Sequence, residues 1–301
     1  KFPEDAERIK KDRENKKRLP GILLPSQIQI SADIKEACAS NILVLATPAQ
    51  TIREVCACIA SLVQENAYLI IAAKGIEVST HLLMSEIVSE LIPQAGVAVL
   101  SGPSFADEVA RGLPTAITLA AQNIQTATYL GAAFNSDSFR VYASDDIIGV
   151  QLGGALKNVL AIGTGMIRSL GLGANAEAAL ITRGIVEISR LACALGAKPA
   201  TLHGLSGLGD IVLTCSHEKS RNMFLGMEIG KGKTPAQVVS ETAKTFEGLA
   251  TSKSISALAT AAGVEMPICG MIDKILNQEV AVKEAIIFLM NRSMKPEVED
   301  H

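Results

Sequence analysis

Continuous hydrophobic runs divide the first half of the chain into short buried segments. Residues 41–47 and 68–73 are almost wholly apolar, which is typical of strands buried on both faces of a sheet. Helical patterns separate these runs, and this alternation predicts a parallel sheet with right-handed crossovers. The expected strands are 28–30, 41–47, 68–73, 97–100, 115–120 and 139–143. The expected helices in this part are 5–18, 33–39, 50–64, 81–91, 105–110 and 124–134.

The pattern changes after residue 144. From Ile147 onward the apolar positions follow helical spacing only, and no strand is expected. The helical patterns cover 150–167, 174–197, 234–243, 252–262, 268–277 and 280–291. We therefore predict an α/β half over residues 1–144 and an all-helical half over residues 145–301.

Composition narrows the class of protein. With 48% hydrophobic and 20% charged residues, the chain is typical of a globular protein. Its 3% aromatic content and net charge of -3 argue against nucleic acid as a partner. We found no signal peptide and no apolar run of membrane-spanning length without charge, Pro or Gly, so we expect a cytoplasmic protein with no membrane partner. The six Cys and four His show no metal-ligand spacing, so no metal is expected.

One lysine stands out in the helical half. Between Val150 and Met166 the only ionisable side chain is Lys157. A helix that is apolar around most of its circumference is buried, and burial disfavours the charged form of a lysine. Such a lysine can exchange a proton with a substrate near neutral pH. The alternative is a lysine whose ammonium group reaches water from a helix end.

Three loops follow the expected strands, at the edge of the sheet where ligands bind in α/β folds. They are Thr47-Pro48, Lys74-Gly75 and Ser101-Gly102-Pro103-Ser104. The third supplies hydroxyl and backbone N–H groups before a helical stretch, which suits an anion. Ser101 and Ser104 could equally be simple helix caps.

The helical half has polar groups of its own beside glycines and at an expected helix start. Asp210 ends a glycine-rich turn, where backbone can approach a ligand closely. Ser220, Arg221 and Asn222 together can hold a phosphate group, although Arg221 alone could form a surface salt bridge. Glu247 precedes a glycine and could instead mark a helix C-terminus. Their convergence with Lys157 is a hypothesis at this stage.

Several long motifs resemble those of the bacterial NAD(P)-dependent glycerol-3-phosphate dehydrogenases. The motifs that carry the resemblance are Ser101-Gly-Pro-Ser-Phe-Ala106, Phe139-Arg-Val-Tyr142, Ile148-Gly-Val-Gln-Leu-Gly-Gly-Ala-Leu-Lys-Asn158, Ala179-Leu-Ile-Thr-Arg-Gly184, Gly207-Leu-Gly-Asp210 and Ser220-Arg-Asn222. The resemblance implies a Rossmann-like dinucleotide-binding domain over 1–144. It also implies a helical substrate-binding and catalytic domain over 145–301, of the type found at the C-terminus of 6-phosphogluconate dehydrogenase.

The resemblance also implies an activity and a set of site residues. The activity is the interconversion of dihydroxyacetone phosphate and sn-glycerol 3-phosphate with NAD or NADP, feeding glycerophospholipid synthesis. Lys157 matches the catalytic proton donor. The substrate-binding positions are Lys74, Gly102, Ser104, Asp210, Ser220, Arg221 and Asn222. The cofactor-binding positions are Lys74, Ala106, Arg221 and Glu247. A homodimer is also suggested by the resemblance.

One departure from the family is large. The family begins with a strand and a Gly-x-Gly-x-x-Gly turn that binds the pyrophosphate, and this segment is absent before Lys1. We expect the α/β domain to be incomplete, the chain to be a fragment of a longer product, and its affinity for NAD(P)H to be poor.

Two other functions stay open from the sequence. The helix carrying Gly153 and Lys157 is similar to that of other β-hydroxyacid dehydrogenases, including 6-phosphogluconate dehydrogenase. A non-catalytic remnant that binds a phosphorylated metabolite is the second alternative.

Overall fold

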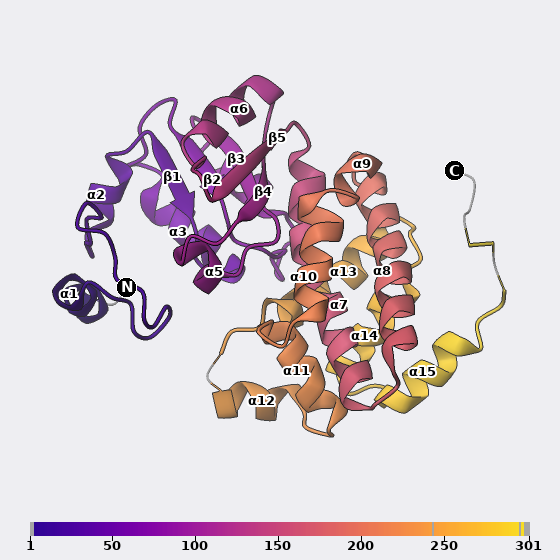
Figure 1. Ribbon diagram of the computed structural model, residues 1–301. Helices are drawn as coiled ribbons and strands as arrows, with labels where there is room; N and C mark the ends of the chain where they lie inside the picture. The colour runs from indigo at the N-terminus through magenta and orange to yellow at the C-terminus, as the bar shows by residue number, and fades with distance from the viewer. Residues whose placement is uncertain (1–2, 243, 295, 298–301) are drawn as a thin grey trace.

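The protein consists of a five-stranded sheet followed by a bundle of helices. The computed structural model describes residues 3–242, 244–294, 296 and 297. The sheet order is β1-β2-β3-β4-β5 (Figure 1). α4 packs against β2 and β3, and α6 packs against β4 and β5. The strands are β1 (Ile42–Leu45), β2 (Tyr68–Ile71), β3 (Gly96–Ser101), β4 (Thr115–Ala121) and β5 (Phe139–Ser144). The helices in this half are α1 (Pro3–Asp12), α2 (Ile34–Cys38), α3 (Ile52–Ile59), α4 (Met84–Leu91), α5 (Ala106–Ala110) and α6 (Ile124–Ala132).

The strands do not all run in the same direction, which corrects one expectation. β1, β2 and β3 are mutually parallel, and β4 is parallel to β5. β4 is antiparallel to β3, with Ser101 opposite Thr118. The connection between them contains only the five-residue helix α5, so it does not form the usual helical crossover that returns a chain to a parallel position.

Two details near the N-terminus also differ from the sequence prediction. Residues 28–30 form no strand, and the Ile28 carbonyl oxygen accepts a side-chain hydrogen bond from Arg13 rather than a bond from a neighbouring strand. The first helix ends at Asp12, well before residue 18, and Arg13 has a φ of 52°, outside the helical range.

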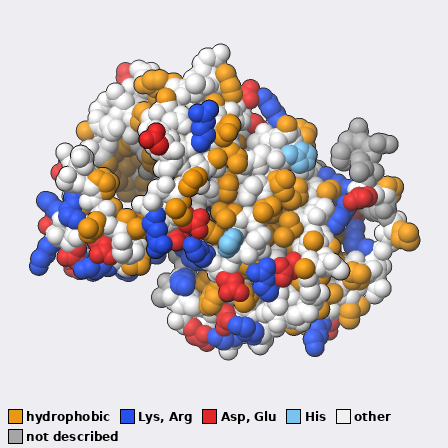
Figure 2. Space-filling model, in the orientation of Figure 1, with side chains coloured by type: hydrophobic (Ala, Val, Ile, Leu, Met, Phe, Trp, Pro, Cys, Tyr) orange, Lys and Arg blue, Asp and Glu red, His pale blue; other side chains and the backbone are white. Residues whose placement is uncertain are grey.

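The edge strand β1 is not buried on both faces as expected. Val44 is 45% exposed, whereas Leu43 and Leu45 face the core. Figure 2 shows a hollow with hydrophobic side chains in the region of β1. The central strand β2 does match the prediction, since Leu69, Ile70 and Ile71 are fully buried.

Helix α7 is the axis of the second half (Figure 1). It spans Ile147–Ser169, and every residue from Gly149 to Ile167 is buried. The close approach of α11 requires a glycine, because a Cβ on Gly226 would lie 2.0 Å from the Ile162 carbonyl oxygen. The other helices are α8 (Ala174–Ala194), α9 (Pro199–Leu202), α10 (Asp210–Ser216), α11 (Arg221–Gly230), α12 (Pro235–Thr242), α13 (Glu247–Ala261), α14 (Pro267–Leu276) and α15 (Val282–Met290). No strand follows Ser144 in the described part of the chain.

By length and composition α7 could cross a membrane, although it contains the charged residue Lys157 and several glycines. However, 89% of its most apolar window is buried inside the protein. A helix covered by its neighbours in this way is the core helix of a folded domain.

Candidate active site

Two lysines from different halves of the chain meet at one buried carboxylate. Lys157 Nζ on α7 donates to Asp210 Oδ1 over 2.5 Å. Lys74 Nζ, which follows β2, donates to Asp210 Oδ2 over 2.8 Å. Asp210 is fully buried, so its charge is balanced by these two ammonium groups rather than by water.

The environment of Lys157 shifts its proton affinity into the neutral range. Burial, and to a smaller extent the nearby charge of Lys74, lower the pKa of Lys157 to about 7, while Asp210 opposes both effects. Both protonation states are therefore populated near neutral pH, as a general acid or base requires. The alternative of a solvent-reaching lysine is wrong, because the residue is 8% exposed.

Local backbone packing brings Asp210 to Lys157. The turn Leu205–Gly209 lies directly against α7, and a Cβ on Gly153 would lie 2.5 Å from the Ser206 carbonyl oxygen. Asp210 then begins α10, and Thr214, one turn later, donates its hydroxyl to Asp210 Oδ1 over 3.4 Å. Sequence reasoning missed Thr214; its position four residues after Asp210 on a helix was the available signal.

The loop after β3 lies beside the same group. Lys74 Nζ donates to the Gly102 carbonyl oxygen over 3.3 Å, and the Ser104 hydroxyl donates to it over 3.0 Å. Gly102 has a φ of 148°, and a Cβ there would lie 2.9 Å from Ile117 Cα, so a glycine is required. The helix-cap interpretation of the two serines is wrong: Phe105 is the N-cap residue of α5, and its side chain makes no cap hydrogen bond.

A second group of polar residues is centred on Asn158, the residue that follows Lys157 on α7. Asn158 accepts a hydrogen bond from Asn222 Nδ2 over 2.8 Å, and Asn222 Oδ1 accepts from the Gly248 backbone N–H over 3.1 Å. Ser220 caps α11 by accepting from the Met223 backbone N–H. The sequence motif contained Asn158, but its role as the link between α7 and α11 was not predicted.

Glu247 joins the helical half to the first loop of the sheet. Its carboxylate accepts a hydrogen bond from the Ala49 backbone N–H over 3.2 Å. Burial raises the pKa of Glu247, while the Ala49 hydrogen bond and the charge of Arg221 oppose this rise. Glu247 is the first residue of α13, so the interpretation as a helix C-terminus is wrong.

The remaining predicted residues are at the margin of these groups. The Arg221 guanidinium donates to the Thr245 carbonyl oxygen over 3.4 Å, so this contact is not a surface salt bridge. Ala106 is the first residue of α5. No group of three or more His, Cys, Asp or Glu side chains suitable for a metal was found among the described residues.

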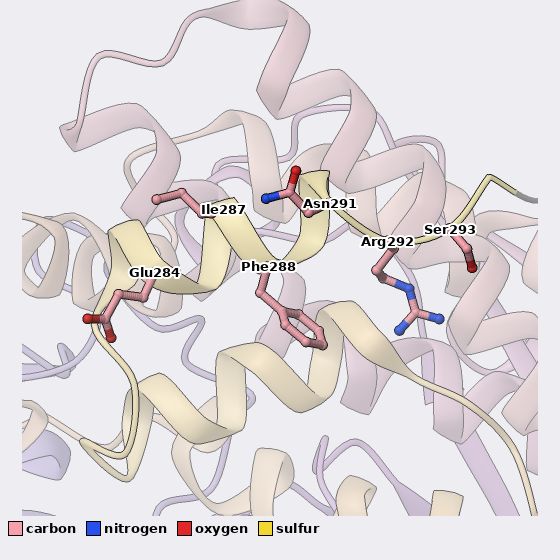
Figure 3. A pocket seen from close by; sticks show the side chains of 6 residues that line it. All are labelled: Glu284, Ile287, Phe288, Asn291, Arg292 and Ser293. Carbon is pink, nitrogen blue, oxygen red and sulfur yellow. The ribbon is translucent and has the colours of Figure 1, made fainter.

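Cavities elsewhere contain none of the predicted site residues. A pocket of about 660 Å³ lies along α15, where Phe288 and Arg292 line it (Figure 3). A second, of about 600 Å³, lies between α7, α8, α14 and α15. The polar groups described above are therefore the candidate site.

Comparison with known proteins decides between the families that the sequence left open. The NAD-dependent glycerol-3-phosphate dehydrogenase family matches in both its parts, its N-terminal model over residues 2–127 and its C-terminal model over residues 146–287. The chain belongs to this family. The predicted family, its Rossmann-like and helical fold and its NAD(P) dependence are thereby confirmed.

Individual glycerol-3-phosphate dehydrogenases agree with this assignment. The chain is 46% identical to glycerol-3-phosphate dehydrogenase [NAD(P)+] of Parvibaculum lavamentivorans, covering 94% of this chain and 85% of the relative. It is 43% identical to the Caulobacter vibrioides enzyme of the same name, covering 98% and 89%. The crystal structure of glycerol-3-phosphate dehydrogenase from Coxiella burnetii superimposes with a TM-score of 0.92 at 35% identity, covering 96% of this chain and 89% of that chain.

More distant dehydrogenases share only the fold. A D-mandelate dehydrogenase in complex with NADH superimposes with a TM-score of 0.54 at 13% identity, covering 91% of this chain and 88% of that chain. The higher TM-score and sequence identity of the Coxiella burnetii structure favour the glycerol-3-phosphate dehydrogenases over these more distant dehydrogenases.

Proposed function

We propose that this protein interconverts dihydroxyacetone phosphate and sn-glycerol 3-phosphate with NAD(P)H, and that Lys157 is its catalytic acid and base. The observation that carries this proposal is the contact of Lys157 and Lys74 with opposite oxygens of Asp210. It places a lysine with a pKa near neutrality beside two further charged groups that can hold and orient a small polar substrate.

In the reductive direction, the Lys157 ammonium donates its proton to the carbonyl oxygen of the substrate. A nicotinamide nucleotide held beside Glu247 would supply the hydride for the carbonyl carbon. Asp210 orients the ammonium of Lys157 by accepting its hydrogen bond, and Lys74 keeps the Lys157 pKa low enough for the proton to leave. In the oxidative direction, neutral Lys157 takes the proton from the substrate hydroxyl.

The phosphate group of the substrate is assigned to the start of α11. Helix N-termini attract anions, and Ser220, Arg221 and Asn222 add a hydroxyl, a guanidinium and an amide at this end. Asn158, next to Lys157, holds Asn222 and so fixes the distance between this anchor and the proton donor. Gly102 and Ser104 are proposed to contact the substrate from the sheet side.

The residues around Glu247 fit the nicotinamide end of the cofactor. The hydroxyl oxygens of Thr47 and Thr251 are buried, and no hydrogen-bond partner for either was found within the described residues. Buried polar atoms of this kind call for a partner, and a bound nucleotide can supply one. We propose that Glu247, Lys74, Ala106 and Arg221 bind the cofactor together with these hydroxyl groups.

We infer that the two halves of the chain have different roles. Residues 1–144 are proposed as the dinucleotide-binding domain and residues 145–301 as the substrate-binding and catalytic domain. The partner is a small phosphorylated molecule, and we infer a cytoplasmic enzyme that acts without nucleic acid or membrane, as a homodimer.

Enzyme assays test this proposal directly. NADPH and NADH oxidation should be followed with dihydroxyacetone phosphate, and NADP+ and NAD+ reduction with 6-phosphogluconate as the alternative substrate. We expect turnover of the first substrate only. Phosphate-dependent thermal stabilisation without hydride transfer, even at saturating cofactor, would instead support a non-catalytic binding protein.

A further inference from the structure

A second junction between the two halves lies next to the proposed phosphate anchor. Lys219 Nζ donates to Asp107 Oδ2 and to Glu108 Oε1, each over 3.0 Å. The same ammonium group lies 5.8 Å from the centre of the Phe105 ring. The His217 and Phe105 rings pack in a T-shaped arrangement, with their centroids 5.9 Å apart and an interplanar angle of 88°.

On both sides of this junction, the residues are adjacent in sequence to residues of the candidate site. His217 and Lys219 belong to the connection between α10, which begins with Asp210, and α11, whose cap is Ser220. Phe105, Asp107 and Glu108 follow the Gly102–Ser104 loop without a break. Any movement of α5 away from this connection therefore separates the two sets of residues assigned to the substrate.

We propose that Lys219, Asp107 and Glu108 form a latch that positions the loop after β3 against the phosphate anchor and so sets the affinity for the phosphorylated substrate. These are positioning residues, since Lys219 acts through the carboxylates of α5. The inference rests on the proposed function, because it assigns the substrate to this site. The competing explanation is that Lys219 itself binds the phosphate.

Charge-removing variants separate these two explanations. Lys219→Met should raise the KM for dihydroxyacetone phosphate about fivefold and leave kcat within about twofold, because exposed ion pairs and a cation–π contact are individually weak. The double variant Asp107→Asn, Glu108→Gln should raise the KM by the same factor, and adding Lys219→Met to it should have no further effect. If Lys219 bound the phosphate directly, removing the two acids would leave the KM unchanged or lower it, and the latch would be refuted.

Two further variants test whether the loss of any exposed ion pair would raise the KM in the same way. Lys219→Arg keeps both ion pairs and should retain the parent KM. Lys198→Met removes another exposed ion pair, Lys198 with Asp145 at 2.6 Å, which lies within the helical half near the start of α7. We expect it to change neither KM nor kcat; a fivefold rise in KM here would show that any such ion pair has this effect and would overturn the specific role of Lys219.

Hydrogen exchange makes the test independent of turnover. The backbone amides of α5 should exchange faster in Lys219→Met than in the parent, and at the parent rate in Lys198→Met. Unchanged α5 exchange in Lys219→Met would overturn the latch even in an active enzyme. Absence of turnover in the parent with faster α5 exchange in the variant would count against the proposed function alone.

Discussion

Lys74 and Asp210 are 136 residues apart in the chain, yet their side chains form an ion pair of 2.8 Å that joins the sheet to the helical bundle. The other oxygen of the same carboxylate accepts from Lys157. Because Lys74 and Asp210 both lie beside Lys157, removing the charge of either one alters the proton affinity of Lys157.

Replacing Lys157 by Met should abolish most catalysis while leaving substrate binding nearly intact. The variant loses the proton donor, so kcat should fall by about a hundredfold or more, as for other general acids. The KM for dihydroxyacetone phosphate should change far less. Steady-state kinetics measure both constants, and a raised KM with an unchanged kcat would remove Lys157 from the chemistry.

The pH dependence of the reductive reaction should respond in opposite directions to two substitutions. In the parent, kcat should decline as the pH rises through the Lys157 pKa of about 7, because reduction needs the ammonium form. Asp210→Asn removes a charge that raises this pKa, so the decline should move to lower pH. Lys74→Met removes a charge that lowers it, so the decline should move to higher pH. Profiles of kcat against pH that move in the same direction in both variants would contradict this arrangement.

Arg221→Ala should act mainly on binding. The guanidinium is proposed to contact the phosphate, which is distant from the reacting carbonyl, so its loss should raise the KM about tenfold to a hundredfold. kcat should fall much less. Arg183→Ala is a matched control, since this guanidinium contacts the Glu297 carbonyl oxygen and lines a cavity that contains none of the proposed site residues. A larger effect on kcat than on KM would place Arg221 at the reacting centre instead.

Two glycines in helices should give opposite stability changes when replaced by alanine. Gly226→Ala places a Cβ 2.0 Å from the Ile162 carbonyl oxygen, so α7 and α11 must move apart, at about 2 kcal/mol or more. Gly270→Ala in α14 meets nothing within 4 Å and should stabilise the protein by about 0.5–1 kcal/mol, because alanine favours helix. Urea unfolding of both variants measures the change, and equal destabilisation would show that the α7–α11 contact is not special.

The hydrophobic pattern alone predicted most elements of the fold. β2 and β3 lie where continuous apolar runs indicated strands, and β5 matches the strand expected at residues 139–143. α7 lies where a long apolar run contained a single lysine. These predictions succeeded because the periodicity of apolar positions reports directly how a segment is buried. The same rule failed at residues 28–30, where a short alternation formed no strand, and at Val44, where an edge strand lacks a covering layer.

The tertiary structure determined the strand directions and long-range contacts that the hydrophobic pattern does not encode. Periodicity indicates that a face is buried but not which segment covers it, so the direction of β4 and the contact of Lys74 with Asp210 were not available from the sequence. The sequence by itself determined that Lys157 would be buried in an apolar helix. Only the fold brought Asp210 and Lys74 to it, and the pKa of a buried lysine depends on the distance and sign of the charges around it as well as on burial.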